Sequence, residues 1–412
     1  MGTTLYRRFW NLCGLVLLAI NLRAAITCVA PVLDNLRVTF GLSGVQVSIL
    51  TALPVLCLGA FASLAPPLAR RVGTEGAVTL SLLLITAGIL LRVLPSPITL
   101  FTGTVVAGGG IAMGNVLLPV EIKRRFARRV GSLTGLAMML MAATGALAAA
   151  LTVPLDHSAG WRVALAVWAV PSLAATLLWG PRALRGRHER GHPVPADRRL
   201  AGEPSLLRSP LAWALAAFLG LASLMFYVLT AWLPASMQDH GFAQAEAGMM
   251  VSAMMIVGIP MGFVVPVLAV RLNDQRPMIL AVAVIMAVGL TGLLLAPRSG
   301  WVWVPVLGLA TGSAFPLAVT MLSLRSPNPQ VAARLSGMAQ SVGYLLAGFG
   351  PVSFGLLHTL TGGWQVPLLL LLVLVVPETF FGLLAARPGF VLPDTVRLTA
   401  SAGLLVELNI PA

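Results

Sequence analysis

Lysine, cysteine and histidine are scarce in this chain, and so is charge of any kind. Only 10% of its 412 residues are charged, with 13 acidic residues, five histidines and three cysteines, and Lys123 is the single lysine. Because Ile122 rather than glycine precedes this lysine, no GxxxxGK loop exists to hold the phosphates of a nucleotide. The chain also has no GxSxG motif and no close pair of carboxylates in the middle of an apolar segment. These absences predict that ATP hydrolysis is not the driving force, and that the protein is not an enzyme and uses no cofactor or metal.

Apolar residues dominate instead. Hydrophobic residues make up 58% of the chain and its mean hydropathy is +0.92, which is typical of a protein that crosses a membrane many times. A helix of about 20 residues is long enough to cross the hydrocarbon core of a bilayer. Twelve apolar segments of suitable length can be drawn: 9–34, 45–69, 76–94, 98–120, 130–153, 161–180, 209–234, 242–270, 277–296, 301–323, 335–358 and 364–386. We therefore predict an all-α membrane protein with twelve transmembrane helices in the lipid bilayer.

The net charge of +14 would suggest a nucleic-acid partner in a soluble protein, but its location indicates otherwise. If the N-terminus is cytoplasmic, 22 of the 27 basic residues fall in cytoplasmic segments, and only Arg37, Arg92, Arg162 and Arg298 fall outside. An excess of arginine and lysine in the loops of one side is the positive-inside pattern of membrane proteins. The sequence therefore predicts a multi-pass protein of the cytoplasmic membrane, with both termini in the cytoplasm and no nucleic-acid partner.

One long polar interruption divides the chain. Residues 181–208 are rich in proline and arginine and lack hydrophobic periodicity, which predicts a flexible cytoplasmic linker. On either side we predict a bundle of six helices, the N-terminal one over residues 1–180 and the C-terminal one over residues 209–386. Residues 387–412 are predicted to form a disordered cytoplasmic tail.

The two halves repeat each other. Leu-Thr-Gly-Leu-Ala at 133–137 returns 202 residues later as Leu-Ser-Gly-Met-Ala at 335–339. Further along, Trp161 is answered by Trp364 at nearly the same offset. Because six spans return the chain to the side on which it started, the repeats run parallel. Parallel repeats with a site near the middle of the bilayer are typical of transporters.

Arg23 points most directly to function. At 1.5 Å per residue it lies about 15 Å or more from either end of its apolar segment, so its side chain cannot reach the bilayer surface. A guanidinium does not lose its proton, and placing it at the bilayer centre costs at least about 2.5–3.5 kcal/mol. The side chain should therefore face a watery cavity and hold a negative or strongly polar partner, such as a solute. The alternative is a structural arginine that binds the carbonyl groups of a neighbouring helix.

Other polar residues of the apolar segments are candidates for the same cavity. Thr27 and Asp34 follow Arg23 by four and eleven residues and return to its helical face. Asn21 points elsewhere, which favours a hydrogen bond to a neighbouring helix. The substrate-binding residues predicted beside Arg23 lie on other segments: Asn115, Tyr227, Gln340 and Tyr344. The residues predicted for a secondary cavity or a gate are Asn21, Thr27, Trp232 and Ser336.

Three carboxylates could serve either in coupling to protons or in ion pairs: Glu121, Glu378 and Asp34. Glu121 has basic neighbours at the cytoplasmic end of its segment, which favours a structural ion pair or a gate latch. Glu378 lies about 13 Å along a helix from Arg387, which favours an ion pair at the inner interface. Asp34 is predicted to be an interfacial residue at the outer end. Protons therefore remain an open partner.

Several tracts give the chain a family resemblance: Asn21 to Leu33, Gly114 to Phe126, Phe226 to Pro234 and Ala339 to Pro351. Together with the twelve segments and the central basic linker, they make the chain similar to the major facilitator superfamily. Within that superfamily, the tracts resemble the cyanate/2-nitroimidazole transporter family.

The resemblance implies the major facilitator fold, with two six-helix bundles that rock around a central cavity between inward and outward openings. It implies a monomer, and substrates that range from a small anion such as cyanate to neutral nitro-heterocycles. A cytoplasmic loop gate is also implied, carried here by Arg70, Arg71 and, in the second copy, Asp274. The first copy departs from the family's Gly-x-x-x-Asp-Arg pattern, since Ala69 stands where an acidic residue is usual.

These observations predict a secondary or facilitative transporter that binds a small anionic or polar solute at Arg23 and works by alternating access. The alternative is an exporter of neutral nitro-heterocycles or drug-like compounds in which Arg23 is structural. A membrane-bound sensor or scaffold would not need a polar cavity between two repeats. The direction of transport and the coupling ion stay open.

Overall fold

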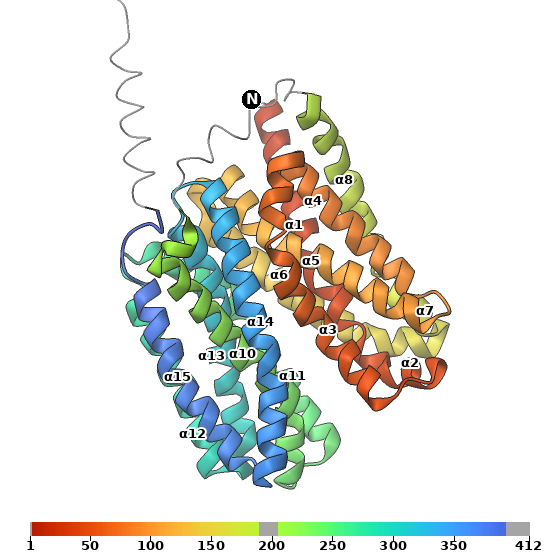
Figure 1. The fold of residues 1–412 in the computed structure, drawn as a ribbon, viewed down its shortest axis with the longest axis vertical. Coiled ribbons are helices and arrows are strands. Elements are labelled where there is room, and N and C mark those ends of the chain that lie inside the picture. Colours follow the sequence, from red (N-terminus) through yellow and green to blue (C-terminus); the bar gives the residue numbers. More distant parts are fainter. Residues whose placement is uncertain (1, 189–204, 393–412) are drawn as a thin grey trace, which may run out of the picture.

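The computed structural model describes residues 2–188 and 205–392, which form helices joined by short turns and contain no strand (Figure 1). The first range contains α1 (Gly2–Thr27), α2 (Leu33–Phe40), α3 (Gly44–Ala62), α4 (Ala65–Arg92), α5 (Pro97–Arg125), α6 (Val130–Ala159), α7 (Trp161–Ala166) and α8 (Ala169–His188). The second contains α10 (Pro210–Asp239), α11 (Gln244–Arg271), α12 (Arg276–Leu295), α13 (Gly300–Leu324), α14 (Pro329–Thr361) and α15 (Gln365–Ala385). Within these ranges, twelve stretches are long and apolar enough to span a membrane, which confirms the predicted fold class.

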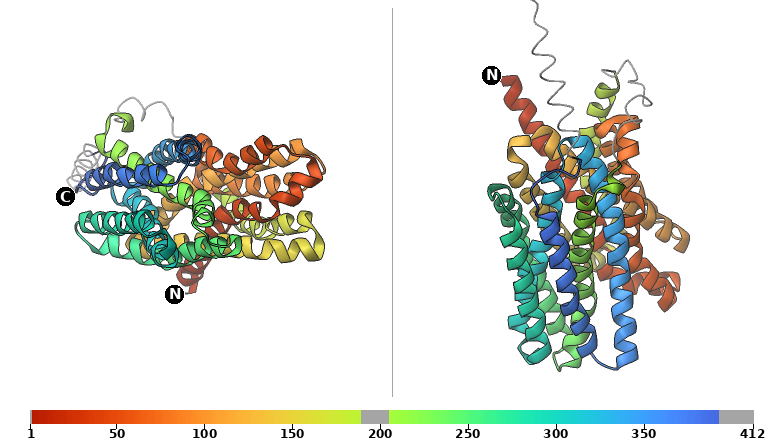
Figure 2. Two further views of the ribbon diagram at one scale, coloured as in Figure 1. Left: turned by 90° about the horizontal axis from the view of Figure 1, so that it is seen from below. Right: turned by 60° about the vertical axis from the view of Figure 1, so that its left-hand side comes forward.

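The helices form two bundles that lie side by side (Figure 1). Helices α1–α8 make the first bundle, in which α4 packs against α5 and α8, and α10–α15 make the second, in which α10 packs against α14 and α15. The start of α1 and the end of α8 lie at one end of the molecule, which we call the terminal end (Figures 1 and 2). The bundles are close together at the terminal end, and they diverge toward the opposite end, where α2 and α7 lie.

Capping residues and prolines set the starts of several spanning helices. Ser96, Ser209 and Asn328 each accept a hydrogen bond from a backbone N–H of the first turn, and each is followed directly by proline. Proline suits this position because its fixed φ matches the helix and its missing N–H would have no partner there. At the start of α3, Ser43 and Gln46 form a reciprocal capping box.

The end of α1 and the start of α4 differ from the ends of the apolar segments that the sequence predicts, and proline is the reason for both. Helix α1 ends at Thr27, and a 3₁₀ turn that contains Pro31 separates it from α2. Asp34 therefore does not share a helical face with Arg23, and that prediction is wrong. The loop predicted near residue 70 is helical, because α4 begins with Pro66 in its first turn and bends only at Gly73, where φ is +79°.

The described structure also extends into the predicted linker and tail. Helix α8 continues through residues 181–188. The N–H of Val391 donates to the Arg325 carbonyl, and Val391 and Leu392 are buried, so these two residues of the predicted tail pack against the second bundle. Residues 189–204 and 393–412, which make up the rest of the linker and tail, lie outside the described residues.

The glycine of the repeated motif lies where the two bundles meet. A Cβ atom at Gly135 on α6 would come within 2.7 Å of the Phe263 carbonyl oxygen on α11. In the second half, a Cβ atom at Gly337 on α14 would come within 2.9 Å of the Pro66 ring and 3.3 Å of the Ala62 carbonyl oxygen. Each copy of the motif thus supplies the small residue that lets its helix approach the other bundle closely.

Candidate functional site

A cavity of about 120 Å³ lies between the two bundles, with walls from α1 and α6 on one side and from α10, α11 and α13 on the other. A single water molecule needs roughly 10–15 Å³ on a comparable measure, so the space can hold a small organic solute. Six of the side chains that line the cavity carry a thioether or a phenyl ring: Met138, Met141, Met254, Met255, Phe226 and Phe315.

Arg23 is the only charged residue among the described residues that line the cavity. Its guanidinium carbon lies 5.4 Å from the centre of the Phe226 ring, which comes from the other bundle. Within the described part of the chain, the half-buried side chain makes no ion pair and no hydrogen bond. Gly145 makes room for it, since a Cβ atom there would come within 2.7 Å of Arg23 Cγ. The structure therefore places Arg23 where the sequence predicts it, at a cavity and without a carboxylate partner of its own.

Two tyrosines stand behind the cavity wall beside Arg23. The Tyr227 ring meets Phe226 edge-on, with 5.4 Å between ring centres, and the Tyr344 ring lies 6.3 Å from Phe315. Both phenol groups lie within electrostatic range of the Arg23 guanidinium. Neither lines the cavity itself in this conformation. These two predicted residues are thus brought to the site, one layer back from its surface.

Gln340, Ser336 and Asn115 connect the bundles instead of facing the cavity. Gln340 is 2% exposed, and its amide nitrogen donates to Ser336 Oγ at 2.8 Å and to the Asn115 backbone oxygen on α5 at 3.3 Å. The polar stripe predicted on this helix therefore exists. It lies at a packed contact between helices, where none of the three residues lines the cavity.

Of the residues predicted for the edge of the cavity, only Thr27 lines it. Its hydroxyl group donates to the Gly145 carbonyl oxygen at 2.9 Å. Asn21 is buried, and its amide donates to the carbonyl oxygens of Leu17 and Pro171, so it connects α1 to α8. The expected hydrogen bond from Asn21 to a neighbouring helix is confirmed, and the alternative place in a cavity or gate is wrong, because this helix contact takes up its donors.

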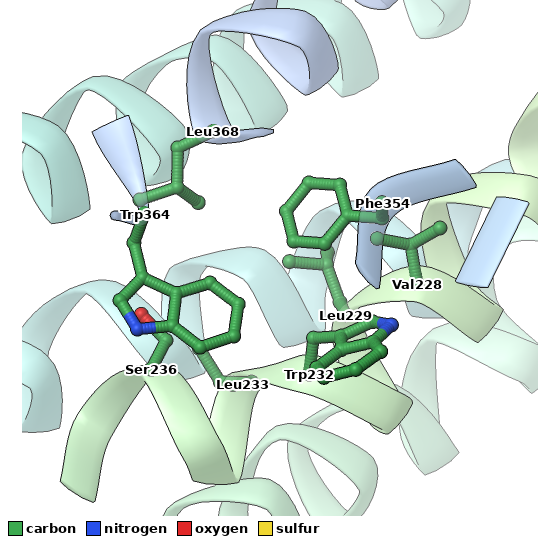
Figure 3. Close-up of a pocket in the computed structure, with 8 residues that line it drawn as sticks. All are labelled: Val228, Leu229, Trp232, Leu233, Ser236, Phe354, Trp364 and Leu368. Atoms are coloured by element: carbon green, nitrogen blue, oxygen red, sulfur yellow. The ribbon is translucent and has the colours of Figure 1, made fainter. Parts of the chain in front are cut away.

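Trp232 belongs to a second, much smaller pocket of about 10 Å³, which Figure 3 shows. It lies close to Trp364, with 5.9 Å between ring centres, and its indole N–H donates to the Pro351 carbonyl oxygen at 2.8 Å. Phe354 closes another side of this pocket. The space is at most large enough for one water molecule, so this aromatic cluster is a packed contact within the second bundle.

The predicted coupling carboxylates have three different environments. Glu121 is buried and paired within its own bundle, 2.5 Å from Arg125 Nε and 3.7 Å from Arg124, which confirms the structural ion pair. Asp34 is exposed on α2.

Glu378 is 4% exposed, and no cation of the described residues lies within 4.0 Å of it. The predicted ion pair with Arg387 is wrong, because α15 ends at Ala385 and Arg387 points to the surface.

The predicted loop gate is replaced by a different set of ion pairs. Arg70 and Arg71 are exposed and make no ion pair with a described residue, and Asp274 only contacts its neighbour Arg276. The acidic residue that the sequence pattern lacks is supplied by Glu75, just beyond the bend of α4. Its Oε1 accepts from Arg124 at 2.7 Å and from Arg125 at 2.6 Å.

In the second bundle, Arg325 holds the equivalent place. It is 8% exposed and donates to the Gln275 side chain and to the carbonyl oxygens of Ala385 and Ala386. Burial lowers the pKa of the Arg325 guanidinium, and the Asp274 carboxylate opposes this shift. A guanidinium nevertheless keeps its charge at neutral pH, so Arg325 locks the ends of α12, α13 and α15 together.

Lys123 joins the two bundles at the terminal end. Its ammonium group donates to the carbonyl oxygen of Ser323 in the last turn of α13, at 2.7 Å, and to that of Ser326 just beyond the helix. The last carbonyl groups of a helix have no partner within the helix, and a cation there also favours the helix dipole. The single lysine thus closes the terminal end of the molecule in this conformation.

Sequence reasoning misses the apolar wall of the cavity. Phe226, Phe315 and the four methionines carry no polar signal, and in an apolar helix nothing distinguishes a cavity-facing side chain from a lipid-facing one. The one available signal is Met254 next to Met255 in a methionine-rich segment, which is more simply explained by packing.

Residues 188–192 read His-Glu-Arg-Gly-His, which matches the HExxH spacing of helical zinc sites. Four of the five residues lie outside the described ranges, and no group of three metal-ligating side chains occurs within those ranges. In the sequence, this match lies in the arginine-rich stretch that joins the two halves, and we do not propose a metal site there.

Comparisons with known proteins agree with this architecture. Residues 15–351 match the Major Facilitator Superfamily. The chain is 41% identical over 375 residues to the 2-nitroimidazole transporter of Escherichia coli (strain K12), covering 91% of this chain and 94% of that protein. It is 32% identical over 354 residues to the cyanate transport protein CynX of the same organism, covering 85% and 90%. Its fold matches the proton:xylose symporter XylE with a TM-score of 0.78 at 13% identity, covering 94% and 98%.

Proposed function

The chain belongs to the Major Facilitator Superfamily, and from this membership we propose that it transports small, flat or linear solutes with a negatively charged or negatively polarised end. The observation that carries the proposal is Arg23, a charge that faces an apolar cavity, contacts the Phe226 ring, and has no hydrogen-bond or ion-pair partner among the described residues. A guanidinium offers several donors in one plane, which suits a nitro, carboxylate or cyanate group. Methionine and phenylalanine walls suit the rest of such a solute.

Electrostatics favours a ligand over an empty site. A positive charge in a cavity of low polarity attracts an anion more strongly than it would in water. A neutral solute with a nitro group gains less, but it still accepts hydrogen bonds from a charged donor, which are the strong ones. Both kinds of solute named for the relatives, a nitroimidazole and cyanate, have this feature.

Arg23 as a purely structural residue has less support. A structural arginine in a membrane helix should bind the carbonyl groups of a neighbouring helix or a carboxylate. Arg92 does this, since its guanidinium donates to the Ala25 carbonyl oxygen at 2.6 Å. Arg23 makes no such bond within the described residues. This difference favours binding at Arg23 over an exporter in which Arg23 only supports the fold.

The conformation fits one state of an alternating-access cycle. The positive-inside pattern places the terminal end in the cytoplasm. The bundles meet there through Lys123, Gly135 and Gly337, so the cavity belongs to a state closed toward the cytoplasm. A solute that binds more tightly to a state closed on both sides would shift the population toward it.

The test is direct binding to the purified protein in detergent, with 2-nitroimidazole and cyanate as separate probes. Removal of a hydrogen bond to a charged group costs about 1.5–3 kcal/mol. Arg23→Gln should therefore weaken binding of the true ligand by roughly 10- to 150-fold. The matched control is Arg298→Gln, which removes an exposed arginine and should leave binding unchanged. Unchanged binding in Arg23→Gln would contradict the proposal.

A further inference from the structure

Glu378 is a buried carboxyl group that no cation neutralises. It lies on α15, is 4% exposed, and its Oε1 atom has no hydrogen-bond partner. The other buried carboxylate within residues 2–188 and 205–392, Glu121, has two arginines beside it. An isolated carboxylate in an apolar interior is so unfavourable that the group takes up a proton instead. Glu378 is therefore a place where the second bundle can bind a proton.

The face of α15 that carries Glu378 points into the second bundle. Gly382 lies one turn further on, and a Cβ atom there would come within 2.8 Å of Ile279 on α12 and 3.1 Å of Phe218 on α10. Residues four apart share a helical face. Because α10 and α15 run in opposite directions and Gly382 lies beside Phe218, Glu378 faces the same two helices one turn away, near the level of Ala222.

Other titratable and charged groups on the helices that pack against α15 are directed elsewhere. Helix α10 carries Tyr227 beside Arg23 and Asp239 at its far end, and α12 carries Arg276 at its start. On α14, Tyr344 lies beside the cavity and His358 lies 4.0 Å from Asp239. None of these residues, and not Arg334 of α14 either, forms an ion pair or hydrogen bond with Glu378.

Helix α10 connects this carboxyl group with the cavity. Phe226, which contacts Arg23, lies one turn beyond Ala222 on α10. A shift of α10 relative to α15 would therefore move a wall of the cavity and the surroundings of Glu378 together. Because an ionised carboxylate needs water or a cation, the charge of Glu378 and the position of α10 depend on each other.

We propose that Glu378 is a proton-binding site that couples transport to a proton gradient. It holds its proton in the conformation described here and releases it where movement of the second bundle admits water. The step is the gain or loss of one proton at a carboxylate oxygen, and only an O–H bond forms or breaks. The coupling role rests on the proposed transport function, whereas the proton on Glu378 does not.

The coupling is tested with the full-length protein in proteoliposomes and labelled 2-nitroimidazole as the probe. With one proton per solute, the accumulation ratio should change about tenfold for each unit of pH difference across the membrane. Glu378→Gln, which cannot titrate, should exchange labelled for unlabelled solute like the native protein but lose the dependence on the gradient. Glu378→Asp should retain it, and so should Asp34→Asn, which removes an exposed carboxylate.

Two outcomes of this experiment overturn the coupling role. One is accumulation by Glu378→Gln that follows the gradient as in the native protein. The other is loss of solute exchange in both Glu378→Gln and Glu378→Asp, which would make the residue structural.

Infrared spectroscopy of the purified protein tests the proton itself without any solute. The native protein at neutral pH should show the carbonyl stretch of a protonated carboxylic acid. The band should be missing in Glu378→Gln and unchanged in Asp34→Asn. A band of full intensity in Glu378→Gln would overturn the proton site even where 2-nitroimidazole is transported. If 2-nitroimidazole is not a substrate, loss of the band in Glu378→Gln would still support the proton site.

Discussion

Arg325 donates to Gln275 in the second bundle as Arg124 donates to Glu75 in the first. The distances from Nη2 to Oε1 are 2.6 Å and 2.7 Å. The two arginines lie 201 residues apart in the sequence, and the two acceptors lie 200 residues apart. The repeat therefore extends to individual side-chain contacts at the terminal end. One difference remains between the halves, because the acceptor is a carboxylate in the first and an amide in the second.

The two acceptors are not interchangeable. The Glu75 carboxylate serves two arginines, and a neutral amide would weaken both contacts. The Gln275 amide nitrogen donates to the carbonyl oxygens of Ala269 and Leu272, which a carboxylate cannot do. We expect Glu75→Gln to lower the free energy of unfolding by about 1.5–3 kcal/mol, the range for hydrogen bonds to charged groups. We expect Gln275→Glu, which loses two neutral hydrogen bonds, to lower it by about 1–3 kcal/mol. Thermal melting in detergent measures this.

Asp34→Asn serves as the control, since it replaces an exposed carboxylate and should melt like the native protein. A Gln275→Glu protein that melts at or above the native temperature would contradict the prediction. It would mean that attraction to Arg325 outweighs the two lost hydrogen bonds and the burial of a new charge.

Gly145 determines where the Arg23 side chain can lie. A Cβ atom at Gly145 would come within 2.7 Å of Arg23 Cγ and 3.5 Å of Thr27 Cγ2. Gly145→Ala should therefore displace the guanidinium from the cavity without removing its charge. Loss of the hydrogen bond from the guanidinium to the solute would cost about 1.5–3 kcal/mol. Binding of the probe that Arg23→Gln weakens should thus weaken in Gly145→Ala as well, and calorimetry with the purified protein measures it.

The matched control for this substitution is Gly180→Ala on α8, where a Cβ atom would have no neighbour within 4 Å. Both variants should melt within a few degrees of each other. Binding that is the same in Gly145→Ala and Gly180→Ala would show that the position of Arg23 is not set by α6.

Features that follow from composition and local pattern can be predicted from this sequence. The spans and the place of Arg23 depend on the energy of polar groups in a bilayer, which each residue carries by itself. The repeat follows from the similarity of the two halves. Asp34 and Glu378 are different, because their surroundings depend on the direction of the chain after Pro31 and after Ala385. A helical wheel drawn through such a turn assigns the wrong neighbours.

The sequence also does not show whether a polar or apolar face of a helix contacts a cavity or another helix. Gln340 lies on a polar stripe, which indicates a buried face but does not tell whether that face meets a cavity or a helix. Phe226 is the reverse case, because it contacts Arg23 across the cavity although its own side chain is apolar and the sequence favours its neighbour Tyr227 instead. Only the packing of one bundle against the other decides both.

Because Lys123 is the only lysine, its reactivity toward an amine reagent reports the opening of the terminal end. Its ammonium group donates hydrogen bonds to the Ser323 and Ser326 carbonyl oxygens in this conformation, so modification should be slow.

Gly135→Ala places a Cβ atom within 2.7 Å of the Phe263 carbonyl oxygen and should keep the bundles apart at that end. Overpacking costs typically about 1–3 kcal/mol, which would raise the population of the open state and the rate of modification by roughly 5- to 150-fold. Mass spectrometry of the modified peptide measures the rate separately from that of the N-terminal amine. Gly180→Ala should leave it unchanged, and an equal rate in all three proteins would show that Lys123 does not close the terminal end.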